Sequence, residues 1–137
     1  MSFDLSDIPG GASIEGARLR FYQVKVEGAP YQKLGSLILE HVNYGSQLNR
    51  AAYDTPSLDS ATLARQPSPG SWYNIVDQPI ADWVEQDLAA GRDRFQVRLR
   101  WAQETDGDDQ EDYASMVPGN NYFGTGNVPV LVVTYGP

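Results

Sequence analysis

A stretch of strict alternation between apolar and polar residues constrains the fold of this chain more than any other feature. In residues 94–101, RFQVRLRW, apolar side chains occupy every second position and polar side chains occupy the positions between them. A period of two predicts a strand with one buried face, as in an antiparallel sheet with one face in water. This strand runs directly into the most acidic segment of the chain, ETDGDDQED at 104–112.

Further alternating segments, separated by turn residues, predict a protein that is almost entirely β. The strands are expected at 2–5, 15–26, 36–44, 60–63, 72–76, 113–117 and 128–135. The apolar phase of 15–26 shifts by one residue, which predicts a bulge near Tyr22. The apolar run of 128–135 indicates a central position in a sheet. The prediction is a single domain over 1–137, folded as a jelly-roll-type antiparallel β-sandwich with one short helix at about 79–91.

The one predicted helix carries an apolar stripe at helical spacing. Asp77 is expected to cap its N-terminus, and Gly91 is expected to end it. Ile80, Trp83, Val84 and Leu88 form the stripe, and Asp82, Glu85, Gln86 and Asp87 are expected to face solvent.

The charge of the chain is concentrated in one place. Its 18 acids and 10 bases give a net charge of −8, and six of the acids lie within 104–112. Without that segment 12 acids face 10 bases, a net of −2. The excess of acid argues against nucleic-acid binding, which needs a basic surface. No apolar run approaches the roughly 20 residues of a membrane span, so no membrane insertion is expected.

The acidic segment is the best candidate for a metal site. Carboxylate oxygens at short spacing are the ligands that Ca²⁺ prefers. The segment is not an EF-hand, because the sixth position from Asp106 is Glu111 rather than glycine. The alternative is a solvated acidic turn. The candidate ligands for calcium are Glu104, Asp106, Asp108 and Asp112.

Two pairs of arginines are candidate ligand-binding residues. Arg18 and Arg20 share the polar face of one predicted strand, and Arg98 and Arg100 share the polar face of another. If the two strands belong to one sheet, the four side chains form a basic strip. Such a strip suits the carboxylates of an anionic polysaccharide, which a guanidinium binds through two hydrogen bonds. The alternative is ordinary surface arginines paired with nearby acids.

The aromatic residues divide into two groups. Trp72, Trp83 and Trp101 lie on apolar faces and are expected in the core. The others lie in or beside loops, where they either stack on sugar rings or are simply exposed. This second group comprises Tyr44, Tyr53, Tyr122 and Phe123.

The sequence predicts a protein without catalytic activity. It has no cysteine, and His41 is the only histidine, so no histidine pair can bind a metal. His41 shares a face with Leu37 and Leu39 and is expected to be a core residue with its polar atoms satisfied. The acidic residues lie together on one turn rather than on opposite sides of a cleft, as a glycosidase would require.

Four segments, taken in order, resemble the DNRLRE-type domain of bacterial and archaeal surface proteins, which is related to the family 96 carbohydrate-binding modules. They are FDLSDIPGGASIEGARLRFY, VDQPIADWVEQDLAAGRDRFQVRLR, ETDGDDQEDY and NVPVLVVTY. The resemblance implies a secreted, non-catalytic jelly roll, and some relatives bind polysaccharide such as alginate. It therefore implies an extracellular or cell-surface location, although the N-terminus has no signal peptide of its own.

This chain departs from that pattern at its start. Such domains usually have further strands before the FDL segment, whereas here Met1 stands almost on it. A sandwich that lacks N-terminal strands has an open sheet edge, which another chain can fill. The alternative hypothesis is therefore a structural subunit of a surface assembly or fibre, whose partners are other copies or domains of a surface protein. A further alternative is that the chain is a fragment.

Overall fold

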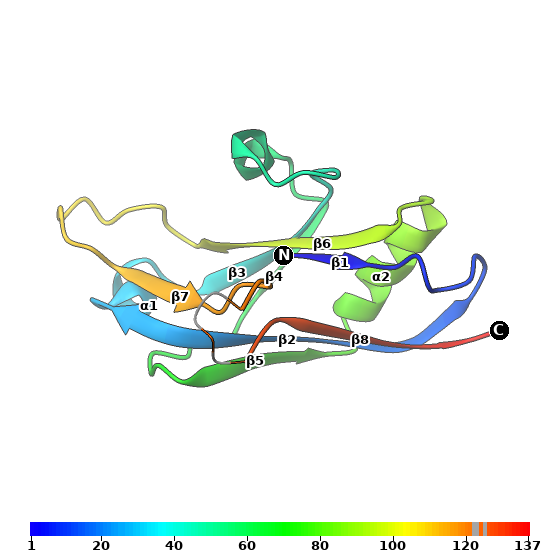
Figure 1. Cartoon of the computed structure of the whole chain (residues 1–137). Helices are drawn as coiled ribbons and strands as arrows, with labels where there is room; N and C mark the ends of the chain where they lie inside the picture. The colour runs from blue at the N-terminus through cyan, green and yellow to red at the C-terminus, as the bar shows by residue number, and fades with distance from the viewer. Residues whose placement is uncertain (122–123, 125) are drawn as a thin grey trace.

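The computed structural model describes residues 1–121, 124 and 126–137 and shows two antiparallel sheets packed face to face (Figure 1). The first sheet has the order β1-β6-β3-β4, with bounds Ser2–Asp4, Arg94–Trp101, Leu37–Val42 and Asp59–Thr62. The second sheet contains β5, β2, β7 and β8, with bounds Ser71–Val76, Ser13–Glu27, Tyr113–Met116 and Val130–Gly136. The predicted β-sandwich with one short helix is confirmed.

The long strand β2 organises the second sheet. Strand β5 pairs with it on one side. On the other side β8 pairs with its first half, and β7 pairs with its last residues. The bulge predicted near Tyr22 is present: the register of β2 with β7 shifts between Gln23 and Lys25.

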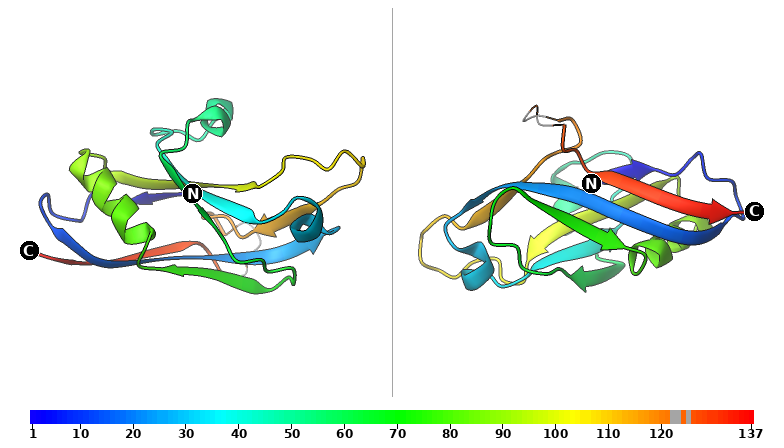
Figure 2. Two further views of the ribbon diagram at one scale, coloured as in Figure 1. Left: turned by 180° about the vertical axis from the view of Figure 1, so that it is seen from behind. Right: turned by 90° about the horizontal axis from the view of Figure 1, so that it is seen from below.

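Three helical segments complete the described fold. Helix α1 spans Pro30–Lys33, the 3₁₀ helix η1 spans Arg50–Asp54, and helix α2 spans Ile80–Ala89. Helix α2 lies between the two sheets, whereas η1 stands above the outer face of the first sheet (Figure 2). No helix in the described ranges is both long enough and apolar enough to cross a membrane.

The core lies between the sheets and follows the predicted alternation. Leu19 and Phe21 of β2, Phe95 and Val97 of β6, and Trp83 of α2 are completely buried. Burial of each such side chain contributes about 1.5–3 kcal/mol to folding. The period of two in residues 94–101 therefore predicted the buried face of β6 correctly.

The prediction that residues 128–135 form a central strand is wrong. Among the described strands β8 pairs only with β2. Leu131 and Val133 pack against the core, but Val130 and Val132 point outward and are 40% and 51% exposed. The apolar run therefore reflects the preference of valine for strands rather than burial of both faces.

Two predictions for the helix are also wrong. The Asp77 side chain makes no capping hydrogen bond; instead the Asp77 carbonyl accepts a hydrogen bond from the Ala81 amide at 2.8 Å. Asp87 does not face solvent but is completely buried. Its carboxylate accepts a hydrogen bond from Arg92 at 2.7 Å and lies 2.9 Å from Nε2 of His41, so its burial is compensated.

Candidate functional site

The acidic loop between β6 and β7 brings three of its carboxylates together. Asp106, Asp108 and Asp112 each contribute one oxygen to a group in which all oxygens lie within 4.8 Å of one another. Glu104, the fourth predicted ligand, is not part of this group and instead lines a groove on the first sheet. The structure thus gathers three of the four predicted metal ligands.

Local turns orient two of these carboxylates. Oδ1 of Asp106 accepts a hydrogen bond from the Asp108 amide at 3.3 Å, and Oδ1 of Asp108 accepts one from the Gln110 amide at 2.8 Å. These are side-chain turns of the kind that aspartate forms two residues along the backbone. Because Oδ1 is used locally in both residues, Oδ2 remains to face the centre of the cluster.

Asp112 is the buried member of the cluster. Its side chain is only 3% exposed, and Oδ1 accepts a hydrogen bond from the Ala29 amide at 2.7 Å. Its Oδ2 is buried without a hydrogen-bond partner among the described residues. The Lys33 ammonium lies 3.4 Å from this oxygen, which is close enough for an ion pair but not for a good hydrogen bond. A buried, incompletely satisfied carboxylate oxygen is costly unless a cation reaches it.

Lys33, at the end of α1, lies among the three carboxylates. Its Nζ is 2.6 Å from Oδ2 of Asp108 and 3.9 Å from Oδ2 of Asp106. The hydrogen bond to Asp108 raises the pKa of Lys33, and the same bond lowers the pKa of Asp108. Sequence reasoning missed this lysine, because it precedes Asp108 by 75 residues and no local motif connects them.

The geometry of the cluster fits a divalent cation. Two oxygens bound to one Ca²⁺ at 2.3–2.6 Å are separated by at most about 4.6–5.2 Å. The oxygens of the cluster lie within 4.8 Å of one another, which is inside this range. The three residues can therefore hold a metal ion.

The four-arginine strip does not form. Arg18 and Arg20 lie on β2 in the second sheet, whereas Arg98 and Arg100 lie on β6 in the first. Alternation had placed each pair on an outward face, but it carries no information on which sheet a strand joins. The two pairs therefore lie on different sheets and have different surroundings.

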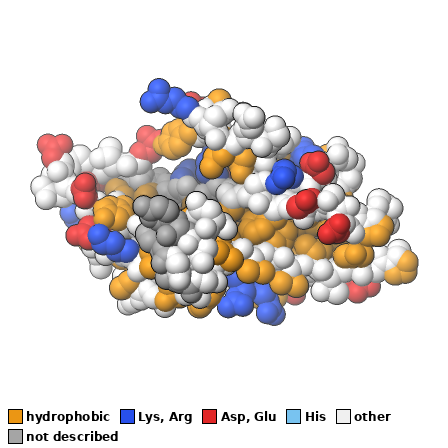
Figure 3. Space-filling view, viewed as in Figure 1, with side chains coloured by type: hydrophobic (Ala, Val, Ile, Leu, Met, Phe, Trp, Pro, Cys, Tyr) orange, Lys and Arg blue, Asp and Glu red, His pale blue; other side chains and the backbone are white. Residues whose placement is uncertain are grey.

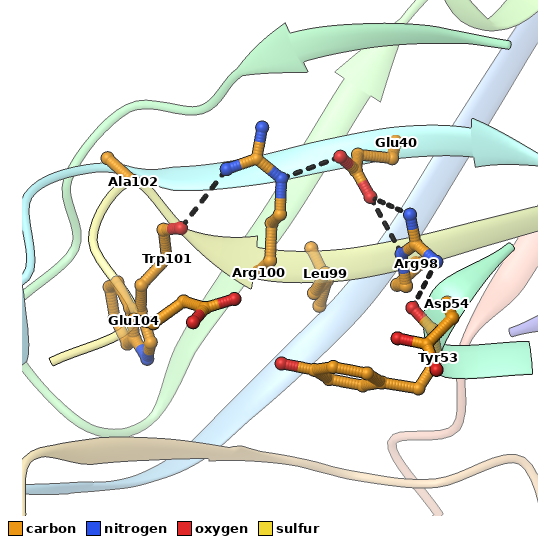
Figure 4. A pocket seen from close by; sticks show the side chains of 9 residues that line it. All are labelled: Glu40, Tyr53, Asp54, Arg98, Leu99, Arg100, Trp101, Ala102 and Glu104. Atoms are coloured by element: carbon orange, nitrogen blue, oxygen red, sulfur yellow. Dashed lines mark hydrogen bonds and ion pairs between the residues drawn. The ribbon is translucent and has the colours of Figure 1, made fainter. Parts of the chain in front are cut away.

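Arg98 and Arg100 are both paired with Glu40 of β3 (Figure 4). Oε2 of Glu40 accepts from Nε of Arg98 at 2.7 Å, and Oε1 accepts from Nε of Arg100 at 2.6 Å. Burial favours a higher pKa for Glu40, but hydrogen bonds from Arg100 and Arg98 outweigh it, so its pKa lies below the ordinary value. Arg98 also donates to three backbone carbonyls of the η1 region, those of Ala52, Tyr53 and Thr55.

A groove of about 530 Å³ lies beside these arginines on the first sheet (Figure 4). Tyr53, which is 70% exposed, stands at one side of it, and Glu104 and Trp101 stand at the other. Its charged lining consists of two arginines and three acids: Arg98, Arg100, Glu40, Asp54 and Glu104. With one more negative than positive charge, this groove does not favour an anion.

Arg18 and Arg20 have a different environment on the outer face of the second sheet. Arg20 lies over the ring of Trp72 at 4.4 Å, and Tyr22 meets the same ring edge-on at 5.0 Å. Arg18 is paired in register with Val76 on β5 and Val132 on β8. Both valines are exposed, by 45% and 51%. In Figure 3 basic side chains project from the lower side of the molecule, where this sheet lies.

The predictions for the aromatic residues and histidine are partly confirmed. Trp83 lies in the core, and Trp101 packs against the core. Trp72 lies on the outer face of the second sheet, so the assignment of Trp72 to the core was wrong. His41 is completely buried, as predicted; its Nε2 pairs with Asp87, whereas its Nδ1 has no partner among the described residues. Tyr44 is partly buried. Tyr122 and Phe123 lie outside the described residues.

Comparison with models of known protein families gives no match, and no curated protein matches the chain. The resemblance to the DNRLRE-type domain therefore stays a prediction.

Proposed function

We propose that this protein is a non-catalytic module of the cell surface or extracellular space that binds an anionic polysaccharide and is stabilised by calcium. The ligand would lie on the outer face of the second sheet, across β5, β2 and β8. The observation that supports this site is the pair Arg18 and Arg20. Neither forms an ion pair with a carboxylate of the described residues, although acids outnumber bases in the chain.

The surroundings of these arginines suit an anionic chain. Alternate residues on a strand are about 6.5 Å apart, so the two guanidinium groups can meet successive carboxylates of a polymer. Stacking on Trp72 restrains Arg20, which reduces the entropy lost on binding. Exposed Val76 and Val132 offer apolar surface for the carbon faces of sugar rings.

Arg98 and Arg100 are less suitable for this role. A single carboxylate, that of Glu40, already binds both guanidinium groups. Arg98 is only 20% exposed and is held by backbone carbonyls as well. An anion at this position would have to displace Glu40 and would meet Glu104 and Asp54 in the same groove. We therefore assign the arginines on β6 a structural role.

Calcium is the metal that suits the acidic loop best. All three candidate ligands are carboxylates, which favour a hard cation over a transition metal. Calcium also tolerates irregular coordination and a coordination sphere completed by water and backbone oxygens, whereas Mg²⁺ demands a near-ideal octahedron. Bound calcium would fix the loop against α1 and so stabilise this end of the sandwich.

The glycan site is tested by binding a polyuronate and, separately, a neutral glucan to immobilised protein. Arg18→Ala and Arg20→Ala are each expected to weaken polyuronate binding by about tenfold, since each removes charge-assisted hydrogen bonds. Arg50→Ala is the matched control, because it removes an exposed arginine from η1 on the other sheet. Equal losses in all three variants, or equal binding of both polymers by the wild type, would refute the site.

The calcium site is tested by thermal unfolding with Ca²⁺, with Mg²⁺ and with a chelator. Ca²⁺ at about 100 times its dissociation constant should stabilise the protein by about 2.7 kcal/mol and raise its melting temperature accordingly. Asp112→Asn should abolish this shift, whereas Asp82→Asn, on the exposed side of α2, should retain it. If Ca²⁺ and the chelator give the same melting temperature in the wild type, no calcium site exists.

One observation favours the alternative function, a structural subunit that assembles by strand addition. Strand β8 has seven residues without a charge, and among the described strands it pairs only with β2. Natural edge strands usually carry charges, prolines or bulges that prevent pairing with other chains. If the protein assembles through this edge, light scattering should show a mass that grows with concentration. Val132→Lys should abolish this growth, and Val76→Lys, on the opposite edge strand, should not.

A further inference from the structure

The position of Lys33 has a consequence for the metal site. Its ammonium nitrogen lies 2.6, 3.4 and 3.9 Å from one oxygen each of Asp108, Asp112 and Asp106. These are the same three residues whose oxygens form the candidate metal cluster. The lysine therefore lies where a bound cation would lie, hydrogen-bonded to Asp108 and within ion-pair distance of the other two carboxylates.

An ammonium group and a metal ion cannot share this place. Ca²⁺ approaches each oxygen to about 2.3–2.6 Å. The ammonium nitrogen of Lys33 comes that close to Asp108 alone and carries half the charge. Two cations bound to the same three oxygens would lie within a few ångströms of each other and repel strongly. Binding of the metal therefore requires Lys33 to leave the cluster.

Lys33 can leave without unfolding its helix. Tyr31 and Leu34, on either side of it, are buried and hold α1 in place. The Lys33 side chain itself is 36% exposed, so its flexible stem has a route to solvent. The side chain of Asp112, by contrast, is only 3% exposed and accepts a hydrogen bond from the Ala29 amide. Asp112 is therefore held in place as a ligand, whereas the Lys33 side chain is free to move out of the cluster.

We infer that Lys33 is a tethered competitor that sets the affinity and selectivity of the metal site. This inference rests on the proposed calcium site. While the ammonium group lies in the cluster, a monovalent cation gains nothing by replacing it. Only a divalent cation, with twice the charge and shorter bonds, has a net advantage. The site is then filled only where the divalent ion is abundant.

The experiment is a calorimetric titration of the intact chain with Ca²⁺ after treatment with chelator. Lys33→Met retains most of the side-chain volume but removes the ammonium group. It is expected to bind Ca²⁺ at least about tenfold more tightly than the wild type, because a like charge has been removed from the site. Lys25→Met is the matched control: it makes the same change in net charge, but Lys25 contacts Glu27 and Tyr113 rather than the cluster. This control should change the affinity by less than about threefold.

The possible outcomes separate the two proposals. A gain specific to Lys33→Met supports the tethered competitor. Binding that is unchanged or weakened by Lys33→Met overturns it while leaving the calcium site intact. Equal gains in both lysine variants also overturn it, because the effect would then be one of net charge. If neither the wild type nor any folded variant binds Ca²⁺, the calcium site itself fails. Circular dichroism of each variant establishes that it is folded.

Discussion

Glu40 provides the sharpest test of the energetics, because one buried carboxylate serves two arginines. The residue is 4% exposed, and its two oxygens accept hydrogen bonds from Arg98 and Arg100. Glu40→Gln preserves the shape of the side chain but replaces one accepting oxygen with an NH₂ group. This group would face the N–H donors of Arg98 or Arg100. The buried guanidinium of Arg98, only 20% exposed, then loses its counter-ion.

The expected loss of stability follows from the exposure of each partner. Removal of one partner of a buried ion pair costs about 3–5 kcal/mol. Arg100 is 47% exposed and can turn into solvent, so its pair with Glu40 adds little. Arg98 retains its bonds to backbone carbonyls. The loss of stability in Glu40→Gln should therefore be at the lower end of the 3–5 kcal/mol range, about 3 kcal/mol. Such a loss lowers the melting temperature by about 10 °C in a domain of this size.

The pH dependence gives the prediction a second readout. The pKa of Glu40 in the folded protein lies below its ordinary value of 4.5. A carboxyl with a depressed pKa contributes stability that is fully present above its unfolded pKa and is lost as the pH falls through the folded pKa. The difference in free energy of unfolding between the wild type and Glu40→Gln should therefore be largest at neutral pH and should decrease below about pH 4.5.

Urea unfolding at a series of pH values measures both effects. Two controls isolate the buried pair. Arg100→Met should cost less than about 1 kcal/mol, and Glu85→Gln, on the exposed side of α2, should be within about 0.5 kcal/mol of the wild type. A Glu40→Gln variant that loses less than about 1 kcal/mol at neutral pH, or whose loss of stability is unchanged in acid, would show that Glu40 is not the essential counter-ion of Arg98.

Two further predictions concern the polar contacts of α2. Asp87→Asn should destabilise the protein by about 2–4 kcal/mol in urea unfolding, because His41 and Arg92 lose a buried carboxylate. Asp82→Asn is the exposed control, and equal effects of the two variants would contradict the prediction. Trp83→Phe should raise the pKa of Asp59, as measured by NMR titration, because the hydrogen bond from the Trp83 indole is the main cause of its lowered value. An unchanged Asp59 pKa would contradict that assignment.

The fold was largely predictable because burial on one face of a strand leaves a period of two in the sequence. The boundaries of β6, Arg94–Trp101, coincide with the predicted alternating stretch. Phe95 and Val97, apolar positions of that stretch, are completely buried as the alternation predicts. These assignments need only the local pattern, since each side chain's face follows from its position in the strand.

Features that depend on contacts distant in sequence were not predictable in the same way. The pairs Glu40–Arg98 and His41–Asp87 are separated by 58 and 46 residues. A helical pattern classifies Asp87 as a polar residue and hence as exposed, although a distant histidine compensates its burial. The same limitation explains why the sequence left open whether the two arginine pairs share a sheet: alternation determines the face of a strand, and pairing determines its sheet.

The acidic loop lies between these two cases. A dense run of carboxylates indicated a cation site, and three of the four predicted ligands do converge. The sequence could not show that Glu104 points to another groove, because loop geometry is not periodic. Nor could it show that Lys33, from another part of the chain, forms ion pairs within the cluster. The local concentration of acidic residues thus predicted the carboxylate cluster but not the lysine that pairs with it.

Gly28 connects the fold to this cluster and carries the last prediction. It follows β2 with a φ of +67°, and a Cβ at this position would lie 2.3 Å from Oδ1 of Asp112 and 2.5 Å from the Glu111 carbonyl oxygen. Gly28→Ala must therefore displace the loop and break the bond between Ala29 and Asp112. Gly45→Ala is the matched control, since Gly45 has a φ of +84° but open space around its Cβ position.

Comparison of the two glycine variants separates backbone strain from steric exclusion. Gly45→Ala should cost only the left-handed backbone conformation, about 1–2 kcal/mol, and should leave the affinity for Ca²⁺ unchanged. Gly28→Ala should cost at least about 1 kcal/mol more and should also weaken Ca²⁺ binding, because the buried ligand Asp112 is pushed out of place. If the two variants are equally stable and bind Ca²⁺ equally, Asp112 is not anchored by its close approach to Gly28, and the loop adapts to the cation instead of being built around it.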